Sequence, residues 1–418
     1  MKNIILFVIG IFFFQFTSAQ DSTQVDWKSD LDFLKKELPQ KHFKFFAIRS
    51  ENDFSKGIDA IKAESKNLTN FQIALRTQQL IAKFGDSHTM LNPTPLFDQN
   101  QLLPLGFMWA NDKLYVLHTA QEYKQLLGSQ VTKINKIPVA TIIDSISTLL
   151  TVDNRAVQKS QVPNFIPSVQ VLEYFGFTKE KEVSVEFLTS ANKLMNCRVK
   201  PMLITPNNKV SFQPDSLSFG LKNMKHLFTD SYFPQDKIYY ILYNKCISKE
   251  VMLSYGNKEQ AETLPSFEEF GQKILDVLKK EPVSKIIFDL RNNGGGSSAQ
   301  GTALIEKIAA FLKENPKVKT YVVIGRNTFS SAILNAMDFK RLTNAMFVGE
   351  ETAGKPNHFG EVRSFELPSS KLQVYYSTKY FKNVDQDVNT LTPDVYLETS
   401  FADFSKGIDP VYEWVKKQ

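Results

Sequence analysis

The spacing of hydrophobic residues changes along the chain, and these changes divide it into regions. Between residues 20 and 95, apolar residues recur at helical spacing. In one predicted helix they share a single face, made of Ile73, Ala74, Leu80, Ile81 and Phe84. Asn70 can begin this helix, and Gly85 suits the left-handed position that ends one. Residues 20–95 are therefore predicted to form an N-terminal helical region, followed by the polar segment Asp86-Ser87-His88-Thr89.

Residues 96–205 contain short runs of β-forming residues separated by turn residues. The clearest runs are Leu114–Leu117, Val131–Ile134 and Val183–Leu188. The segment Leu105-Gly106-Phe107, together with the later Leu127-Gly128, resembles a PDZ domain, whose loop offers backbone N–H groups to the C-terminal carboxylate of a peptide. We expect a PDZ-like β domain here, with a β domain that binds no ligand as the alternative.

Residues 206–418 alternate between predicted strands and predicted helices. The strands are Lys285–Leu290, Tyr321–Gly325 and Ala345–Val348, and the helices are Ala303–Leu312 and Ser331–Leu342. Such alternation predicts βαβ units on a largely parallel sheet. The heptapeptide Asp-Phe-Ser-Lys-Gly-Ile-Asp occurs at residues 53–59 and again at 403–409. We expect both copies to form turns close to helices.

The composition is that of a globular chain. Its 418 residues predict two or three domains at about 150 residues per domain. Hydrophobic residues make up 42% and charged residues 22%, which excludes wholesale disorder. The net charge of +6 is spread along the chain without a dense basic run, so nucleic acid is not expected as a partner.

Residues 1–19 have the pattern of an export signal. Lys2 supplies a positive start, Ile4–Phe16 is almost wholly apolar, and Thr17-Ser18-Ala19 places small residues at a cleavage site. The apolar run is shorter than the ~20 residues of a membrane-spanning helix, although a membrane anchor is the alternative. We expect a mature chain without a membrane span, in the periplasm or outside the cell.

The chain has two cysteines, Cys197 and Cys246, which are too few for a disulfide framework or a four-cysteine metal site. Cys246 lies in an apolar stretch and is predicted to be a buried thiol. No His-Glu-x-x-His motif and no cluster of cysteine and histidine occurs in the sequence. We therefore expect neither a metal nor another cofactor.

A glycine-rich loop at residues 291–298 leaves a predicted strand and enters a helix. Its glycines allow a tight turn with N–H groups pointing outward, which can bind a phosphate or the oxyanion of an acyl-transfer intermediate. The loop lacks the Gly-Lys-Ser/Thr ending of a phosphate-binding loop. It partly fits a dinucleotide fingerprint, but no acidic residue ends the next strand. A purely structural turn is the remaining alternative.

A second candidate, residues 328–332, also lies between a strand and a helix. Ser330 at such a position exposes its hydroxyl at the sheet edge, beside the N–H of Ser331. The alternative is that Ser330 serves as an ordinary helix N-cap.

Taken in order, these segments resemble the tail-specific, or carboxy-terminal processing, serine peptidases. The branch related to the tricorn core and to retinoid-binding repeats resembles the chain more closely. The shared motifs are Gly85-Asp86-Ser87-His88-Thr89, residues 289–296, Phe329-Ser330-Ser331, residues 349–355 and Thr392-Pro393-Asp394-Val395. The resemblance implies an α/β core like that of crotonase and the Clp peptidase, with an N-terminal helical region and a PDZ-like β insert.

The resemblance also implies roles for single residues. Ser330 is the implied nucleophile, and the implied oxyanion donors are the N–H groups of Ser331 and Gly295. Tail-specific members use a lysine base at the position of Lys355, steadied by a glutamine where this chain has Phe359. Tricorn-like members use a Ser-His pair, which Ser87 and His88 match, and a later glutamate that has no clear counterpart here.

His88 is the favoured general base, and Lys355 is the alternative. An imidazole has an ordinary pKa of about 6.5, whereas a lysine amine starts near 10.4 and would need a shift of roughly three units. A His88 base predicts activity that rises between roughly pH 6 and 7.5.

The sequence thus predicts an exported serine endopeptidase that acts on peptides or unfolded protein segments through an acyl-enzyme on Ser330. One alternative is a catalytically inactive member that binds a peptide or an apolar ligand. Another is an interaction module built around residues 96–205.

Overall fold

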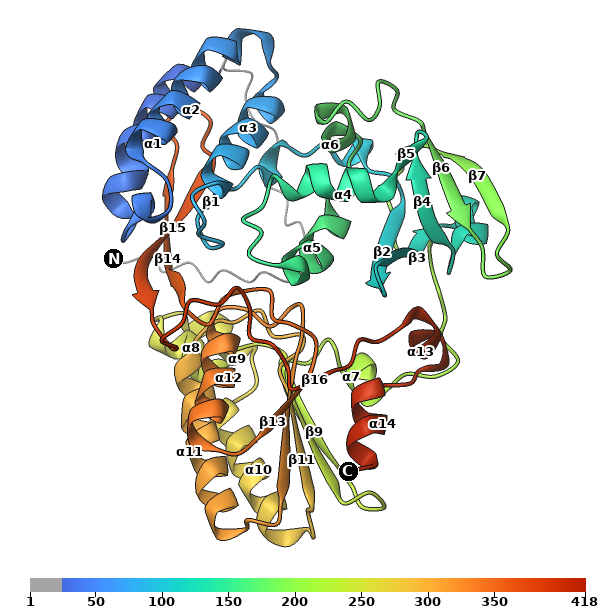
Figure 1. Ribbon diagram of the computed structural model, residues 1–418, viewed down its shortest axis with the longest axis vertical. Coiled ribbons are helices and arrows are strands. Elements are labelled where there is room, and N and C mark those ends of the chain that lie inside the picture. The colour runs from blue at the N-terminus through green and yellow to red at the C-terminus, as the bar shows by residue number, and fades with distance from the viewer. Residues whose placement is uncertain (1–24) are drawn as a thin grey trace.

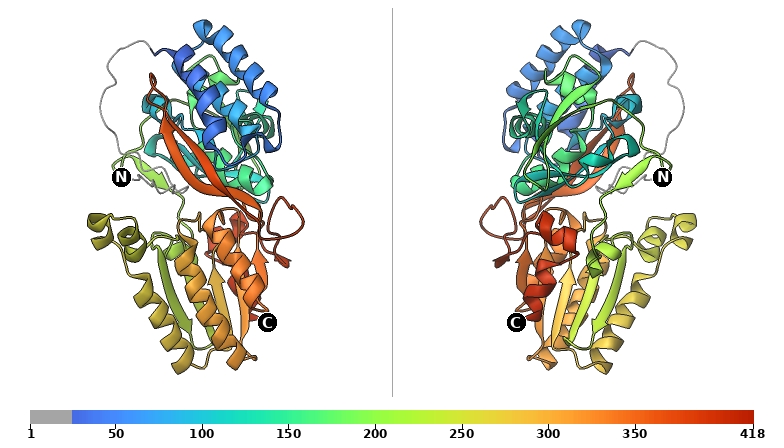
Figure 2. Two further views of the ribbon diagram at one scale, coloured as in Figure 1. Left: turned by 90° about the vertical axis from the view of Figure 1, so that its left-hand side faces the viewer. Right: turned by 90° about the vertical axis from the view of Figure 1, so that its right-hand side faces the viewer.

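The computed structural model describes residues 25–418, so the predicted export signal lies outside the described residues. The described chain forms an N-terminal helical region, a β insert and an α/β core (Figure 1). A long hairpin extends from the core to the helical region (Figure 2).

Helices α1 to α3 make up the helical region. Their bounds are Trp27–Lys41 for α1, Glu51–Glu64 for α2 and Asn70–Ala82 for α3, with short 3-10 turns η1 (Phe45–Ala47) and η2 (Ser65–Asn67) between them. Thr69 caps α3, one residue before the predicted cap Asn70, and forms a capping box with Gln72. Gly85 follows with φ of +76°, as the sequence predicts.

The insert is built on a sheet in which the strands lie in the order β2-β3-β4-β6-β7. These strands are β2 (Leu105–Ala110), β3 (Lys113–Ala120), β4 (Gln130–Ile134), β6 (Val183–Leu188) and β7 (Leu194–Val199). Two short strands pair beside them, β5 (Ile137–Pro138) with β4 and β8 (Lys209–Ser211) with β3. The segment Leu105-Gly106-Phe107 is the start of β2 and pairs with β3, so it is part of the sheet rather than a free loop.

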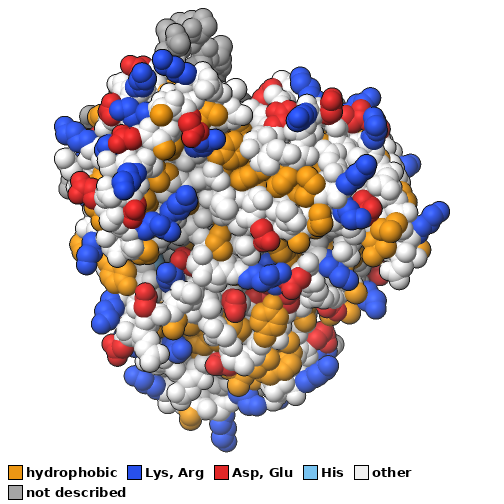
Figure 3. All heavy atoms as spheres, turned by 45° about the horizontal axis from the view of Figure 1, so that its top comes forward, with side chains coloured by type: hydrophobic (Ala, Val, Ile, Leu, Met, Phe, Trp, Pro, Cys, Tyr) orange, Lys and Arg blue, Asp and Glu red, His pale blue; other side chains and the backbone are white. Residues whose placement is uncertain are grey.

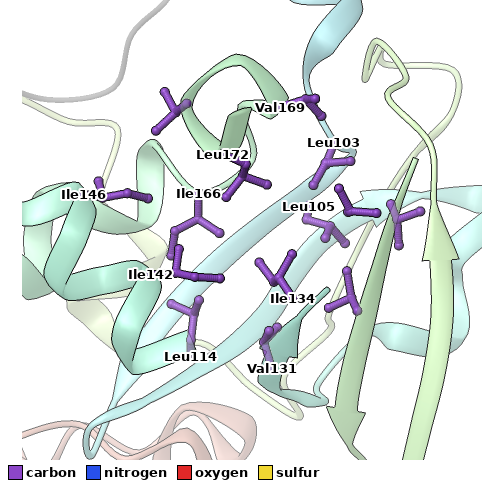
Figure 4. Close-up of a cluster of buried hydrophobic side chains, with 14 of the residues drawn as sticks. Leu103, Leu105, Leu114, Val131, Ile134, Ile142, Ile146, Ile166, Val169 and Leu172 are labelled. Atoms are coloured by element: carbon purple, nitrogen blue, oxygen red, sulfur yellow. The ribbon is translucent and has the colours of Figure 1, made fainter. Parts of the chain in front are cut away.

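Three short helices accompany the insert sheet. They are α4 (Val139–Ser147), α5 (Arg155–Gln161) and α6 (Val169–Tyr174). Apolar side chains fill the space between the helices and the sheet, as Figure 4 shows for Ile142 and Leu172 against Leu105 and Val131. The insert therefore has a hydrophobic core, to which Phe71 and Leu75 of α3 also contribute.

A mostly parallel sheet with the strand order β16-β13-β12-β11-β10-β9 forms the core. Its strands are β9 (Phe228–Phe233), β10 (Ile238–Tyr243), β11 (Lys285–Asp289), β12 (Lys319–Ile324), β13 (Met346–Gly349) and β16 (Val395–Tyr396). Only β9 pairs antiparallel with its neighbour. All residues of β10 are buried, because helices cover both faces of the sheet.

One face of this sheet carries α10 (Phe267–Lys280), α11 (Ser298–Glu314) and α12 (Ser331–Leu342). The other carries α14 (Pro410–Lys416) and α7 (Phe219–Lys222). Shorter helices α8 (Lys249–Ser254), α9 (Lys258–Glu262) and α13 (Phe401–Lys406) lie in the connections. The predicted βαβ alternation on a parallel sheet is confirmed.

The hairpin consists of β14 (His358–Glu366) and β15 (Gln373–Phe381). β15 also pairs with β1 (Met90–Leu91), which directly follows the polar segment at residues 86–89. Val374 and Tyr376 of β15 pack into the core of the helical region. The hairpin therefore connects the loop that contains Lys355, which precedes β14, with the segment that contains His88, which precedes β1.

The two copies of the repeated heptapeptide have different structures. Residues 53–59 lie inside α2, so the prediction of a turn is wrong for this copy. Residues 403–409 end α13 at Gly407, whose φ is +70°, which confirms the prediction for the second copy.

On the face shown in Figure 3, basic and acidic side chains are interspersed over most of the surface. Among residues 25–418, no helix combines the length and the apolar composition that a membrane span needs.

Candidate active site

Ser330 occupies a strained turn between β12 and α12. Its φ of +51° and ψ of −123° lie outside the regions that a residue with a side chain usually adopts. It stands at the N-cap position of α12, but within the described residues its side chain makes no capping hydrogen bond. The Ser330 hydroxyl is therefore not used as an ordinary cap, which was the structural alternative for this serine.

Hydrogen bonds tie this turn to the glycine-rich loop that follows β11. The Thr328 hydroxyl donates to the Leu290 carbonyl at 2.8 Å. The Phe329 N–H donates to the Asn293 carbonyl at 3.0 Å. Two segments that are almost 40 residues apart in sequence are thus held side by side.

Gly295 lies directly against Ser330. A Cβ atom at Gly295 would come within 2.9 Å of the Ser330 Cβ and 3.1 Å of the Ser331 nitrogen. The φ of Gly295 is +104°, which is also unfavourable for any other residue. Glycine is required here both by the close approach and by the backbone conformation.

The Gly295 N–H group already has a partner. It donates to Oδ1 of Asn293 at 2.9 Å, while Nδ2 of this buried side chain donates to the Tyr243 carbonyl at 2.9 Å. The Gly295 amide is therefore not free to bind an oxyanion in this structure, contrary to the sequence prediction.

The neighbouring Gly296 is better placed to donate. It forms a parallel bridge with Cys246, in which the Cys246 N–H bonds the Gly295 carbonyl at 3.1 Å and the Ser297 N–H bonds the Cys246 carbonyl at 2.8 Å. In such a bridge the N–H and C=O of the central residue point away from the partner strand. The Gly296 carbonyl accepts from Oγ of Ser331 at 2.7 Å, which places Gly296 beside the serine turn.

Ser331 is the first residue of α12, and it is buried. The N–H groups in the first turn of a helix have no partner within the helix. The Ser331 N–H is thus available beside Ser330.

The ring of His88 lies next to this turn. It is 4% exposed and stacks on the ring of Phe329, the residue before Ser330, with 4.5 Å between ring centroids. It also stacks on His358 of β14 at 5.7 Å. Neither ring nitrogen of His88 has a hydrogen-bond partner among the described residues. The structure therefore brings His88 beside the Ser330 turn, without a hydrogen bond between the two side chains in this conformation.

Burial lowers the pKa of His88 to about 4, and the nearby His358 adds to this effect while Asp86 opposes it. At neutral pH the imidazole is consequently uncharged, which is the form that accepts a proton.

Asp86, which flanks His88 in the polar segment, accepts hydrogen bonds from that segment and from the end of α1. Its Oδ1 accepts the backbone N–H of His88 at 2.9 Å, and its Oδ2 accepts the Thr89 hydroxyl at 2.5 Å and Nε2–H of His42 at 3.0 Å. Burial pushes the pKa of Asp86 upward, but the hydrogen bond from His42 and the proximity of His88 outweigh it and bring the pKa to about 2. The signal in the sequence was an aspartate two residues before the candidate histidine.

Lys355 is engaged in an ion pair. Its Nζ lies 3.1 Å from Oδ1 of Asp153, a residue of the insert whose side chain is 8% exposed. Burial raises the pKa of Asp153 to about 6 even though Lys355 acts in the opposite direction. The amine of Lys355 is therefore already engaged by a carboxylate in this arrangement.

Ser87 and Cys246 complete the set of residues considered from the sequence. Ser87 is half-buried beside His88 in the chain, and its hydroxyl makes no hydrogen bond within residues 25–418. Cys246 is fully buried, as predicted, and burial raises the pKa of its thiol to about 12. Glu361, the nearest carboxylate after Lys355 in β14, is exposed.

By sequence, no family model matches the chain, and no curated protein matches it either. By structure, the chain is similar to mature CPAF complexed with lactacystin, with a TM-score of 0.64 and 14% identity over 94% of this chain and 97% of that one. A second structure of mature CPAF gives a TM-score of 0.61 at 12% identity, over 94% of this chain and 96% of that one. The chain has the fold of mature CPAF.

Among the structures that match with a lower TM-score is the photosystem II D1 C-terminal processing protease, at 0.40 and 13% identity over 93% of this chain and 99% of that one. At 12–14% identity, the similarity to mature CPAF is one of fold. The fold that the motifs predicted, an α/β core with an N-terminal helical region and a β insert, is therefore confirmed. Among the described residues, no group of three or more histidine, cysteine, aspartate or glutamate side chains could hold a metal ion.

Proposed function

We propose that the chain is a serine peptidase that cleaves peptides or unfolded protein segments through an acyl-enzyme on Ser330. The conformation of Ser330 carries this proposal. Its left-handed turn leaves the hydroxyl uncapped, against Gly295 and beside the stacked rings of Phe329 and His88. A strained serine between a parallel strand and a helix is the arrangement of a nucleophile.

In the proposed reaction, His88 is the general base. The Ser330 oxygen attacks the scissile carbonyl carbon while its proton passes to a ring nitrogen of His88. The uncharged, buried imidazole supports this role, and the engagement of Lys355 with Asp153 supports His88 over Lys355. The side chains of His88 and Ser330 must approach to hydrogen-bond distance when substrate binds, which is common for sites described without substrate.

The tetrahedral oxyanion is held by backbone N–H groups. Ser331 supplies one donor from the start of α12, and Gly296 rather than Gly295 supplies the other. Removal of one such donor typically costs about 10²- to 10³-fold in kcat. The carbon–nitrogen bond of the substrate then breaks, His88 returns its proton to the leaving amine, and water hydrolyses the ester on Ser330.

The pattern of residues 1–19 supports export, and we propose that the mature enzyme works in the periplasm or outside the cell. Its substrates there are peptides or proteins. No cofactor is assigned to the reaction, because the proposed steps need only the serine, the imidazole and the two amides.

A fluorophosphonate probe tests the proposed nucleophile. Ser330 should displace fluoride and become phosphonylated, and Ser330→Ala should lose both labelling and hydrolysis of an unfolded protein substrate. Ser145→Ala, a serine of α4 in the insert, is the matched control and should keep both.

Three outcomes would contradict the proposal. Hydrolysis by Ser330→Ala at the rate of the unchanged protein would exclude the mechanism. A folded protein that binds peptide without labelling or hydrolysis would favour the inactive ligand-binding alternative, and binding by residues 96–205 alone would favour the interaction module.

A further inference from the structure

A buried carboxylate links the N-terminal helical region to His88. Asp86 is 5% exposed, and both of its oxygens are occupied by donors from separate parts of the chain. Oδ2 accepts from the His42 ring at the end of α1 and from the Thr89 hydroxyl, whereas Oδ1 accepts from the backbone N–H of His88. The side chain therefore has a fixed orientation, with one oxygen directed to each histidine.

Hydrogen bonding determines the protonation of His42. The Lys44 N–H donates to Nδ1 of His42 at 3.0 Å, so this nitrogen carries a lone pair and no proton. The proton of the neutral ring is then on Nε2, which donates to Asp86 at 3.0 Å. Phe45 and Phe359 pack edge-on against the ring and hold its plane. His42 is thus a neutral donor that orients an anion.

The free side of Asp86 Oδ1 lies close to the ring of His88. The distance from Oδ1 to Nδ1 of His88 is 3.8 Å, which is about 1 Å longer than a hydrogen bond. A rotation of the ring that shortened this distance would bring the two atoms into hydrogen-bond contact. Nδ1–H would then donate to Asp86 and leave Nε2 as the nitrogen that accepts a proton.

We propose that Asp86 is the acidic positioning residue of His88, and that His42 fixes Asp86 for this task. The proposal rests on the proposed function, in which His88 is the base. It replaces the later glutamate of the resembling family with a carboxylate from the loop of the histidine itself. When His88 takes the proton of Ser330, the adjacent anion stabilises the imidazolium that forms.

The charged and titratable groups around the pair come from several elements. His88 is faced by Asp86 from its own loop and by His358 from β14. Asp86 is faced by His42 from the end of α1, and it lies near enough to Asp153 of the insert to influence its pKa. Among these groups, Asp86 is the one whose charge favours the protonated form of His88.

The substitution Asp86→Asn keeps the size of the side chain and removes its charge. We expect kcat to fall by about 10²- to 10⁴-fold while KM changes by less than about threefold. The substitution removes the group that fixes the tautomer of His88, but it leaves the groups that contact the substrate unchanged. The pKa of His88 should also fall, because the anion that favours the imidazolium is gone. With five histidines in the chain, ¹³C-labelled histidine allows this pKa to be measured by NMR.

A pair of substitutions at His42 tests the second half of the proposal. His42→Leu removes the donor to Asp86 and should lower kcat by about tenfold or more, again with little change in KM. His42→Gln retains an N–H donor and should recover most of the loss. If Asp86→Asn does not fold, this pair of variants still tests the proposal. Equal activity of His42→Leu and His42→Gln would overturn it.

Asp30→Asn is the matched control for loss of a buried carboxylate. Asp30 is fully buried and accepts the N–H groups of Ser369 and Ser370 at 2.7 and 2.8 Å, away from His88. This variant should be less stable but should leave the His88 pKa unchanged. Unchanged kcat and an unchanged His88 pKa in Asp86→Asn would overturn the inference, whereas activity in Ser330→Ala would instead overturn the proposed function.

Discussion

At the scale of single residues, burial and pairing decide which basic side chain near Ser330 can accept a proton. His88 is enclosed between Phe329 and His358, which disfavours its charged form. Lys355 instead has Asp153 at 3.1 Å, so its amine is already engaged in an ion pair. Burial therefore leaves the histidine uncharged and able to accept a proton. Sequence spacing alone left both candidates open.

The pH dependence of kcat/KM follows from this environment. With a His88 pKa of about 4, the imidazole is deprotonated above that pH, so the acidic limb of the profile should have its midpoint well below 6. The unperturbed pKa of a histidine would instead place this rise between roughly pH 6 and 7.5. His88→Ala should lose at least about 100-fold in kcat, whereas Lys355→Met should lose far less. A midpoint near 6.5, or an inactive Lys355→Met beside an active His88→Ala, would contradict the assignment.

At the scale of elements, identical local sequences reach different structures. Both copies of the heptapeptide begin in a capping box, formed by Ser50 with Asp53 and by Ser400 with Asp403. After the first copy comes Ala60 and α2 continues, whereas the second is followed by Pro410. A residue that precedes proline is disfavoured in helical conformation, so α13 ends and α14 begins after Asp409. The residues that follow the repeat thus decide its structure.

Alanine at the two equivalent glycines should therefore have unequal effects on stability. Gly407 has φ of +70°, and a Cβ there would come within 2.3 Å of the Ser216 carbonyl oxygen. Gly407→Ala should lower the free energy of unfolding by at least about 1 kcal/mol. In Gly57→Ala, a gain of up to about 1 kcal/mol in helix propensity is offset by displacement of the flexible Leu80 side chain, 2.4 Å from the new Cβ, so a smaller change is expected. Urea unfolding measures both, and equal losses would contradict the argument.

At the scale of the whole molecule, buried ion pairs fix the insert on the core near the site. Arg326 follows β12 and donates to the carbonyl of Trp109 in β2 at 2.6 Å. It also donates to Glu350 at 2.5 Å and to Glu398 at 2.7 Å, two largely buried carboxylates that follow β13 and β16. Lys159 of α5 pairs with the same Glu398 at 3.0 Å. These interactions join the insert to the three core loops that follow β12, β13 and β16. Arg326, at their centre, is four residues before Ser330 in the sequence.

Loss of the Arg326 charge should be costly, because it leaves buried carboxylates without their main partner. We expect Arg326→Met to lower the free energy of unfolding by about 3–5 kcal/mol. Arg341→Met is the control, since its pair with Asp338 has an arginine that is 61% exposed and should change stability by less than about 1 kcal/mol. Chemical denaturation compares the two, and a loss at Arg326 no larger than at Arg341 would show that this cluster does not stabilise the fold.

The sequence by itself determined the elements that depend on local spacing. The predicted α12 at Ser331–Leu342 has the observed bounds, and β11 and β12 differ from their predictions by no more than two residues at either end. Hydrophobic periodicity, glycine turns and strand–helix alternation each depend on residues that are close in the sequence, so they can be recognised without a structure. The serine turn and the glycine loop were found for the same reason.

Only the tertiary structure decided which groups are free and which are paired. The Asn293 side chain accepts the Gly295 N–H, and Asp153 forms an ion pair with Lys355. His42, 44 residues earlier in the chain, is hydrogen-bonded to Asp86. Each of these contacts depends on how separate segments pack, and the protonation of the site depends in turn on the burial that this packing creates. The candidate groups can be recognised in the local sequence. Whether each one is free, paired or uncharged depends on hydrogen bonds between distant segments and on the burial that their packing creates.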